Sequence, residues 1–290
     1  MKVLMITGDK KFGPGHPRYD LQASVCDLSV VYWGRGSVFP KIPPGPFGVV
    51  TSQDPFWRGL FAWWVARRIG AKLNIQVHTS VLNALGKFVL RRADSVRVVS
   101  EKIRQHIVAI GIRAPITVLP IYVDVSKFRT ITPQPHGQKT ILWVGRFEDE
   151  KDPLLALNVL EAVRQEGVDA ALVMLGTGSL EKSLTARAKG LPVQFPGWRD
   201  PAAYLAQADV VLSTSKHESY GASIIEALAA GVAVVAPDVG VAREAGAIVV
   251  PRSDLGHATA AALRAGARGE LKLALLDPEE WVKRWCGSLQ

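Results

Sequence analysis

Two glutamates, Glu218 and Glu226, are separated by seven residues in the segment KHESYGASIIEALAAG. The small and apolar residues of this segment predict a helix from about Gly221 to Ala230, followed by another glycine that ends it. Glu218 would therefore lie in a loop, and Glu226 more than one turn into the helix. Carboxylates in these two places can accept hydrogen bonds from the hydroxyl groups of a ligand.

The start of this helix, Gly221 with Ala222 and Ser223, would present free backbone N–H groups and the positive end of the helix dipole. Both favour a phosphate, and Gly221 has no side chain to keep it away. With Glu218 and Glu226 on either side, the segment could bind a sugar, a diphosphate and a ribose in the order that a sugar nucleotide presents them. The alternative is that Glu226 lies on a solvent-exposed helix face and Glu218 on a surface turn, neither with a ligand.

A second segment, ILWVGRFEDEKDP, reads as a strand followed by a loop that contains Arg146 and Lys151. Two cations there would neutralise a diphosphate and stabilise a departing nucleoside diphosphate. The acidic run around them leaves a solvated turn as the alternative. A metal site on Glu148, Asp149 and Asp152 is not expected, because no Asp-x-Asp pair is present to hold a nucleotide-bound ion.

Apolar, β-branched runs alternate with helix-like segments along the whole chain, which is typical of parallel strands covered on both faces. The expected strands are 2–6, 28–32, 48–52, 73–77, 95–99, 116–119, 140–145, 171–176, 193–195, 209–213, 232–236 and 247–250, and the clearest helices are 56–70, 101–110, 153–166 and 221–230. This pattern predicts two doubly wound α/β domains. Ligands of such sheets bind beyond the carboxyl ends of the strands, where the candidate loops lie.

The segment TITPQPHGQKT, residues 130–140, is the best candidate linker because it is rich in Pro, Gly and polar residues. We therefore expect a first domain over 1–130 and a second over 131–276. The remaining residues, 277–290, predict a short amphipathic helix that is a candidate for packing back on the first domain.

The net charge of +9 is unevenly distributed along the chain. Residues 1–130 contain 19 Lys and Arg against 7 Asp and Glu, a net charge of +12, and the rest of the chain carries −3. A basic first half suits an anionic lipid surface or a phosphate-bearing substrate. A nucleic-acid partner is not expected, because the basic residues are dispersed and no zinc spacing or helix-turn-helix is evident.

No run of about 18 apolar residues is present, and the first residues are too briefly apolar for a signal peptide. Cys26 and Cys286 are the only cysteines, which indicates a reducing, cytoplasmic setting without disulfides. No metal ion or other cofactor is expected.

The sequence resembles the retaining GT-B glycosyltransferases of family 4, as a variant with a short first domain and a short tail. The pieces that carry the resemblance are VTSQDPFWRG, LNIQVH, RRADSVRVVSE, ITVLPIYVDVSKF, ILWVGRFEDEKDP, LVMLGTGSLE and HESYGASIIEALAAGVAVVAPDVG. The resemblance implies a GT-B fold, with two Rossmann-like domains facing across a cleft. It also implies a nucleoside-diphosphate sugar as donor, a hydroxyl of a glycan or lipid-linked molecule as acceptor, and no metal.

The resemblance further implies the role of each residue in the second domain. Glu218 would bind hydroxyls of the donor sugar and Glu226 those of the ribose. Arg146 and Lys151 would hold the diphosphate with the amides of the predicted helix start. Transfer would retain the anomeric configuration, with attack from the face of the leaving group and strong leaving-group stabilisation.

Four further residues are candidates on the same grounds. Trp198, in FPGWRD, would contact the nucleotide base, with a core tryptophan as the alternative. His78, at the end of LNIQV, would lie near the donor sugar, with a structural, hydrogen-bonded histidine as the alternative. Gly13 and Gly15 would let the backbone approach the diphosphate in place of the family's paired glycines.

The alternatives to a transferase are a non-catalytic GT-B partner subunit and a sugar-nucleotide epimerase. The sequence names neither the sugar, the base, the acceptor, the linkage nor the oligomeric state. In the aromatic segment 56–72, Trp57, Phe61 and Trp64 share a helical face. A helix packed into the core is the favoured interpretation of that face, and peripheral docking on an anionic membrane is the alternative.

Overall fold

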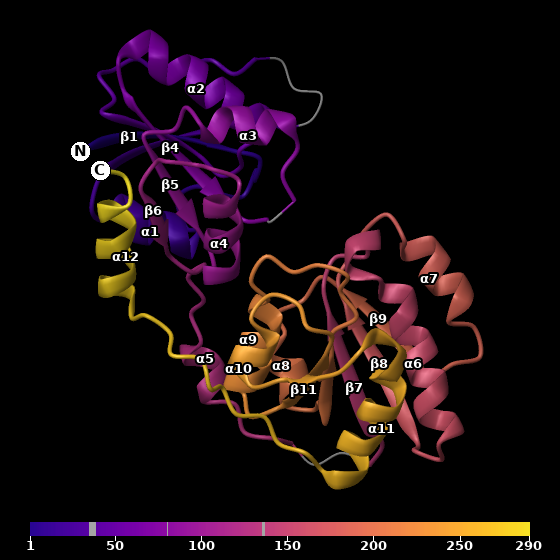
Figure 1. Ribbon diagram of the computed structural model, residues 1–290. Coiled ribbons are helices and arrows are strands. Elements are labelled where there is room, and N and C mark those ends of the chain that lie inside the picture. Colours follow the sequence, from indigo (N-terminus) through magenta and orange to yellow (C-terminus); the bar gives the residue numbers. More distant parts are fainter. Residues whose placement is uncertain (35–38, 80, 135–136) are drawn as a thin grey trace. The chain divides into compact units, whose positions relative to one another are not determined.

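The computed structural model describes residues 1–34, 39–79, 81–134 and 137–290 (Figure 1). The chain divides into two compact units, one of residues Met1–Tyr122 with Leu276–Gln290, the other of residues Val123–Leu275. This division precedes the candidate linker 130–140, of which residues 135–136 lie outside the described residues. The last segment of the chain belongs to the first unit.

The first unit is built on a parallel sheet of six strands. In spatial order these are β2 (Asp27–Tyr32), β1 (Lys2–Thr7), β3 (Val49–Ser52), β4 (Lys72–Val77), β5 (Ser95–Val98) and β6 (Ile116–Val118). The helices around it are α1 (Pro17–Ala23), α2 (Trp57–Ile69), α3 (Ala84–Leu90), α4 (Glu101–Ala109) and α12 (Pro278–Gly287). The strand order reverses between β1 and β3, so the loops that follow these strands border the place where such sheets bind ligands.

The two faces of this sheet differ in chemistry. The face toward α2, α3 and α4 is aliphatic, with Leu4, Ile75 and Val98 among its buried residues. The face toward α1 and α12 is apolar at its edge, where Trp281 and Trp285 of α12 pack, but polar over the central strands. Its central polar residues are Thr51, Asn74, Gln76, Ser95 and Arg97, all buried.

The second unit contains another parallel six-stranded sheet. Its strands are, in spatial order, β12 (Ile248–Val249), β11 (Ala233–Ala236), β10 (Val210–Leu212), β7 (Lys139–Val144), β8 (Ala170–Leu175) and β9 (Val193–Gly197). Its helices are α5 (Ser126–Arg129), α6 (Pro153–Gln165), α7 (Glu181–Arg187), α8 (Ala202–Leu205), α9 (Ala222–Ala229), α10 (Ala242–Ala245) and α11 (Leu255–Ala265). The strand order is that of a dinucleotide-binding Rossmann sheet, and it reverses between β7 and β10.

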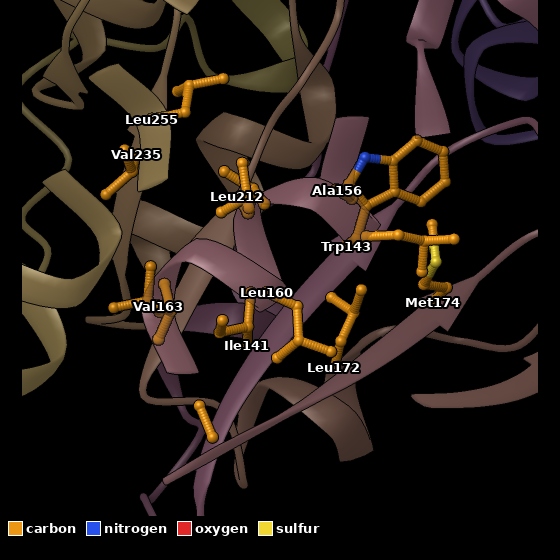
Figure 2. Packing of buried hydrophobic residues seen from close by; sticks show 14 of the residues in the cluster. Ile141, Trp143, Ala156, Leu160, Val163, Leu172, Met174, Leu212, Val235 and Leu255 are labelled. Carbon is orange, nitrogen blue, oxygen red and sulfur yellow. The ribbon is translucent and has the colours of Figure 1, made fainter. Parts of the chain in front are cut away.

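A continuous apolar core holds the second sheet to α6 and α11 (Figure 2). Ile141 and Leu172 of neighbouring strands pack with Leu160 of α6, and all three are fully buried. Burial of each such side chain stabilises the unit by about 1.5 to 3 kcal/mol relative to exposure. The strands of this unit are therefore fixed, and their carboxyl ends hold the loops that follow them.

The predicted α/β class and all twelve predicted strands are confirmed, with strand ends that differ by at most two residues. The run 56–70 is a helix, but the prediction that its aromatic face packs into the core is only partly right. Phe61 is buried, whereas Trp57 and Trp64 are 68% and 49% exposed. In the part of the chain that the structure describes, no helix is long and apolar enough to cross a membrane.

Candidate functional site

The loops that follow β7 and β10 meet at the point where the strand order of the second sheet reverses. Lys151, in the first loop, donates a hydrogen bond from Nζ to Oε1 of Glu218, in the second, at 2.6 Å. Ser215 Oγ donates to the same carboxylate oxygen at 2.8 Å. The ion pair is largely shielded, with side-chain exposures of 18% for Lys151 and 13% for Glu218. Two residues 67 positions apart are thus brought together.

The backbone of the Lys151 loop is held by contacts from two distant segments, which contain Thr214 and Arg252. Asp152 follows in the left-handed conformation, at φ 46°, the only non-glycine residue in the described part of the chain with positive φ. Thr214 Oγ1 donates to the carbonyl oxygens of Lys151 and Asp152 at 2.9 and 2.8 Å, and it accepts a hydrogen bond from Trp143 Nε1. Arg252 binds both the Asp152 carboxylate and the Thr214 carbonyl. These contacts stabilise a backbone conformation that Asp adopts at some cost.

The start of α9 is open to a ligand. Gly221 precedes the helix with φ 97°, a conformation that favours glycine, and no side chain of the described residues caps the helix. Gly240 packs against this turn so closely that a Cβ there would lie 2.3 Å from the carbonyl oxygen of Tyr220. The first N–H groups of α9, from Ala222 and Ser223, are therefore fixed in place with no intrahelical acceptor.

Glu226 is half-buried on α9, and its environment disfavours charge. Burial raises the pKa of its carboxyl to about 7; the nearby Lys127 opposes this rise and Asp200 adds to it. Lys127 of α5 is itself paired with Asp200, at 2.8 Å. Among the residues that the structure describes, none donates a hydrogen bond to the Glu226 side chain. A ligand hydroxyl would supply such a donor.

The other candidates of the second unit lie at the surface. Arg146 forms an ion pair with Glu150 and is 63% exposed, so a diphosphate would compete with a solvated carboxylate for it. Trp198 directly follows β9 and is 62% exposed. The alternative of a core tryptophan is thereby excluded, and the contact of Trp198 with a nucleotide base stays a prediction.

The remaining candidates belong to the first unit. His78 follows β4; burial and the charges of Arg97 and Arg18 lower its pKa to about 3, so it is neutral at pH 7. Its Nε2 is buried and has no hydrogen-bond partner within the described residues. Gly13 and Gly15 lie in the loop after β1, where a Cβ on either would meet no atom within 4 Å. Space for a ligand backbone or phosphate is therefore available beside both.

The described residues contain no group of three or more His, Cys, Asp and Glu side chains arranged to hold a metal ion. The three acids considered from the sequence are engaged separately. Glu148 accepts hydrogen bonds from Ser179, Asp149 pairs with Lys216 at 2.6 Å, and Asp152 binds Arg252.

Comparison with known proteins assigns the second sheet and its loops to a family. Residues 138–266 match the family described as Glycosyl transferases group 1. This range contains Lys151, Glu218, Glu226 and the open start of α9. This match covers less than half of the chain. Of these residues, Lys151 and Glu218 lie on loops at the carboxyl edge of the second sheet, and Glu226 lies on α9.

Two of the curated relatives have lipid substrates or products in their names. The chain is 34% identical over 144 residues to a GDP-mannose-dependent alpha-(1-6)-phosphatidylinositol dimannoside mannosyltransferase of Mycobacterium tuberculosis, covering 46% of this chain and 38% of that protein. It is 25% identical over 225 residues to alpha-monoglucosyldiacylglycerol synthase of Streptococcus pneumoniae, covering 65% and 51%. The matched regions thus span about half the length of these relatives or less.

Solved structures match the whole chain. HepE of Anabaena, in complex with UDP and glucose, superposes with a TM-score of 0.72 and 14% identity, covering 100% of this chain and 99% of that one. Sucrose-phosphate synthase of Thermosynechococcus elongatus gives a TM-score of 0.71 at 16% identity, covering 100% and 95%. The GT-B fold predicted from the sequence is thereby confirmed.

Sequence reasoning missed the residues that hold the site in shape. Thr214, Ser215 and Arg252 contact the loops that carry Lys151 and Glu218, yet none stands in a motif with chemistry of its own. For Thr214 and Ser215 the available signal was position, because both lie within three residues of the carboxyl end of β10. Arg252 gave no signal, because its partner Asp152 is 100 residues away.

Proposed function

We propose that this protein is a hexosyltransferase that moves a sugar from a nucleoside-diphosphate sugar to a hydroxyl of a glycan or lipid-linked acceptor, with retention of configuration and without a metal ion. The observation that carries the proposal is the ion pair of Lys151 and Glu218 beside the uncapped start of α9. A cation, a set of free amides and a carboxylate lie at one sheet edge in a domain of the matching family. These groups suit a diphosphate and the sugar next to it.

The chemistry follows from where charge develops. As the glycosidic bond breaks, negative charge grows on the departing diphosphate, and the ammonium of Lys151 and the amides of Ala222 and Ser223 would stabilise it. Arg146 would add a second cation after leaving Glu150. Lys151 would exchange its bond to Glu218 for the diphosphate, which frees the Glu218 carboxylate for the donor sugar's hydroxyls.

Glu226 suits the ribose end of the donor. Its carboxylate lacks a hydrogen-bond donor among the described residues and would gain one or two from ribose hydroxyls. Trp198, exposed after β9, has a face on which a base can stack. His78, Gly13 and Gly15 are proposed to contribute from the first unit, as the resemblance implies.

The decisive experiment is a thermal-shift panel followed by transfer assays. GDP-mannose, UDP-glucose and UDP-N-acetylglucosamine are compared with their nucleoside diphosphates on the wild type, Glu226→Ala and Lys216→Ala, the last as a control for loss of a nearby surface residue. We expect one base to raise the Tm of the wild type and of Lys216→Ala but not of Glu226→Ala. A lack of response to every nucleotide would contradict the proposal.

Transfer itself is measured by release of the nucleoside diphosphate with and without acceptor lipids or glycans, in EDTA. Release that depends on the acceptor supports a transferase, and NMR of the product anomer tests retention. Conversion of the donor sugar without an acceptor would instead indicate an epimerase. Loss of activity in EDTA that added Mg²⁺ restores would contradict the metal-free mechanism.

We also propose that the first unit docks on an anionic membrane through the aromatic surface of α2, on the cytoplasmic side. Trp57, Trp63 and Trp64, with Trp33, Phe39, Leu60 and Phe61, line an apolar groove of about 540 Å³. Arg68 lies over the Trp64 ring at 5.1 Å. Exposed aromatic rings edged by cations suit a lipid interface with negative head groups.

Sedimentation with vesicles tests the docking surface. We expect binding to vesicles that contain phosphatidylglycerol, weaker binding to pure phosphatidylcholine, and loss of binding in the double variant Trp57→Ser and Trp64→Ser. The matched control is Trp198→Ser, an equally exposed tryptophan of the second unit. Equal binding of all these proteins to both vesicle types would remove the docking proposal.

A further inference from the structure

Three basic side chains of the first unit, those of Arg18, His78 and Arg97, act on one another electrostatically. Arg97 lies on β5 and is only 5% exposed, and His78 follows the neighbouring strand β4. Arg18 of α1 interacts electrostatically with both, lowering the pKa of Arg97 and of His78. Burial lowers the pKa of Arg97 to about 9, so its guanidinium is still charged at pH 7.

Few groups of the protein compensate the positive charge of Arg97. Arg97 donates a hydrogen bond to Oε1 of Gln76, which is neutral, and its guanidinium lies 6.0 Å from the Trp281 ring. Asp9 is the acid that acts on Arg18, but it forms no ion pair with Arg18 in the described structure. No described carboxylate pairs with Arg97 or His78. Buried cations are ordinarily paired, because desolvation of an unpaired charge is costly.

The sheet holds Arg97 in position through a chain of buried polar groups. Gln76 Nε2 donates to Thr51 Oγ1 at 3.2 Å, and Thr51 Oγ1 donates to Asn74 Oδ1 at 2.9 Å. Asn74 in turn donates to the carbonyl oxygen of Ser288, after α12, at 2.9 Å. The oxygen that Arg97 binds is therefore fixed, and the guanidinium is pre-organised rather than free to move.

One orphaned group completes the cluster. The Nε2 atom of His78 is buried without a hydrogen-bond partner in the described part of the chain. A neutral imidazole can donate one N–H, and an anion would accept it together with the N–H groups of two guanidinium ions. Arg18 is half-buried and so remains partly accessible to solvent.

We propose that Arg18, His78 and Arg97 form a binding site for a phosphate group carried by the acceptor. Two guanidinium ions and one imidazole N–H match the oxygens of a phosphate in charge and in hydrogen-bonding sense. Assignment of the phosphate to the acceptor rests on the proposed glycosyltransferase function. The anion site itself does not, because every residue in it belongs to the first unit.

Thermal unfolding with inorganic phosphate, at ionic strength matched with chloride, tests the site. The parent is Lys151→Ala, which weakens anion binding by the second unit. In it, phosphate at ten times its Kd should raise Tm by about 4 °C. Arg97→Gln and Arg18→Gln, made separately in that parent, should each lose the shift, whereas Lys102→Gln, an exposed cation of the same unit, should keep it.

Either of two results would overturn the site: no shift in the parent, or a shift that survives in both arginine variants. Arg18→Gln keeps the test valid if Arg97→Gln does not fold, because Arg18 is half-buried. Glycerol phosphate and vesicles containing phosphatidylinositol, used as further probes, distinguish a soluble from a lipid-borne phosphate.

The nucleotide response of Arg97→Gln in the otherwise wild-type chain separates this site from the proposed function. A retained nucleoside-diphosphate shift with a lost phosphate shift supports two independent anion sites. A phosphate shift with no nucleotide shift would leave the anion site standing while the transferase proposal fails.

Discussion

The two sheets each gather positive charge, but they neutralise it differently. In the second unit the cations of the candidate site have acidic partners: Lys151 binds Glu218, and Arg146 binds Glu150. In the first unit, the described residues offer Arg97 a neutral amide and an aromatic ring. A ligand of the second unit must therefore replace existing ion pairs, whereas an anion in the first would add the missing partner.

The two sites therefore differ in their contribution to stability when no ligand is bound. The paired cations of the second unit have their charge compensated without a ligand, and in the proposed function Glu218 and Lys151 would separate when a donor binds. The unpaired guanidinium of Arg97 stays desolvated until an anion binds. The first site should therefore gain more stability from its ligand than its few contacts suggest.

The largest effect should come from the paired cation at the sheet edge. Lys151→Ala removes the charge that would stabilise the leaving diphosphate, and we expect kcat to fall by about 10²- to 10³-fold. Lys216→Ala, which breaks an exposed ion pair in the neighbouring loop, should change kcat by less than about threefold. Initial rates of nucleoside-diphosphate release measure both; similar losses in the two variants would show that Lys151 has no special role.

Glu226 should give a smaller effect that depends on pH. Its pKa is raised from 4.5 to about 7 in the folded protein, so the folded state holds the proton more tightly than the unfolded state. The free energy of unfolding therefore falls as pH rises from about 4.5 to about 7, by about 1 to 3 kcal/mol from this group, and is level above that.

Glu226→Gln should remove this part of the pH dependence and weaken nucleotide binding by about tenfold at pH 8. Urea unfolding of wild type and variant at pH 5 and pH 8 isolates the contribution, because other groups titrate alike in both proteins. An identical pH dependence in the two would contradict the raised pKa.

Breaking a shielded ion pair of the second unit should reduce the free energy of unfolding more than breaking an exposed one. Arg252→Ala leaves Asp152 without its guanidinium in a left-handed turn, and we expect a loss of about 1 to 3 kcal/mol in the free energy of unfolding. Arg243→Ala breaks the solvated pair with Asp238 and should cost less than about 0.5 kcal/mol. Chemical denaturation compares them; equal losses would mean that Arg252 does not fix the loop.

The smallest predicted effect concerns the affinity of the first unit for phosphate. Asp9→Asn removes the acid that acts on Arg18, while the Asn side-chain oxygen can still accept the Lys11 N–H. We expect inorganic phosphate to bind more tightly to the first unit, because a negative charge near Arg18 is removed. The gain should be only about two- to threefold, because solvent screens the charge of Asp9. Phosphate titrations followed by Tm measure the change, and unchanged or weaker binding would argue against a site beside Arg18.

Much of this molecule could be predicted from local pattern. The apolar runs predicted all twelve strands, and the rule that ligands bind beyond carboxyl strand ends placed Lys151 and Glu218 at one sheet edge. Their contact at 2.6 Å agrees with that placement. The aromatic segment 56–70 was predicted as a helix, but periodicity could not decide which of its tryptophans would be covered.

The sequence alone determined the succession of elements and the residue types available at each loop, because both depend on neighbours along the chain. Only the tertiary structure decided which charges find partners. Arg252 reaches Asp152 across 100 residues, whereas Arg97, in the buried run SVRVV, has no carboxylate partner among the described residues and donates its hydrogen bond to Gln76. Pairing depends on contacts between segments distant in sequence, and burial then sets what an unpaired charge costs.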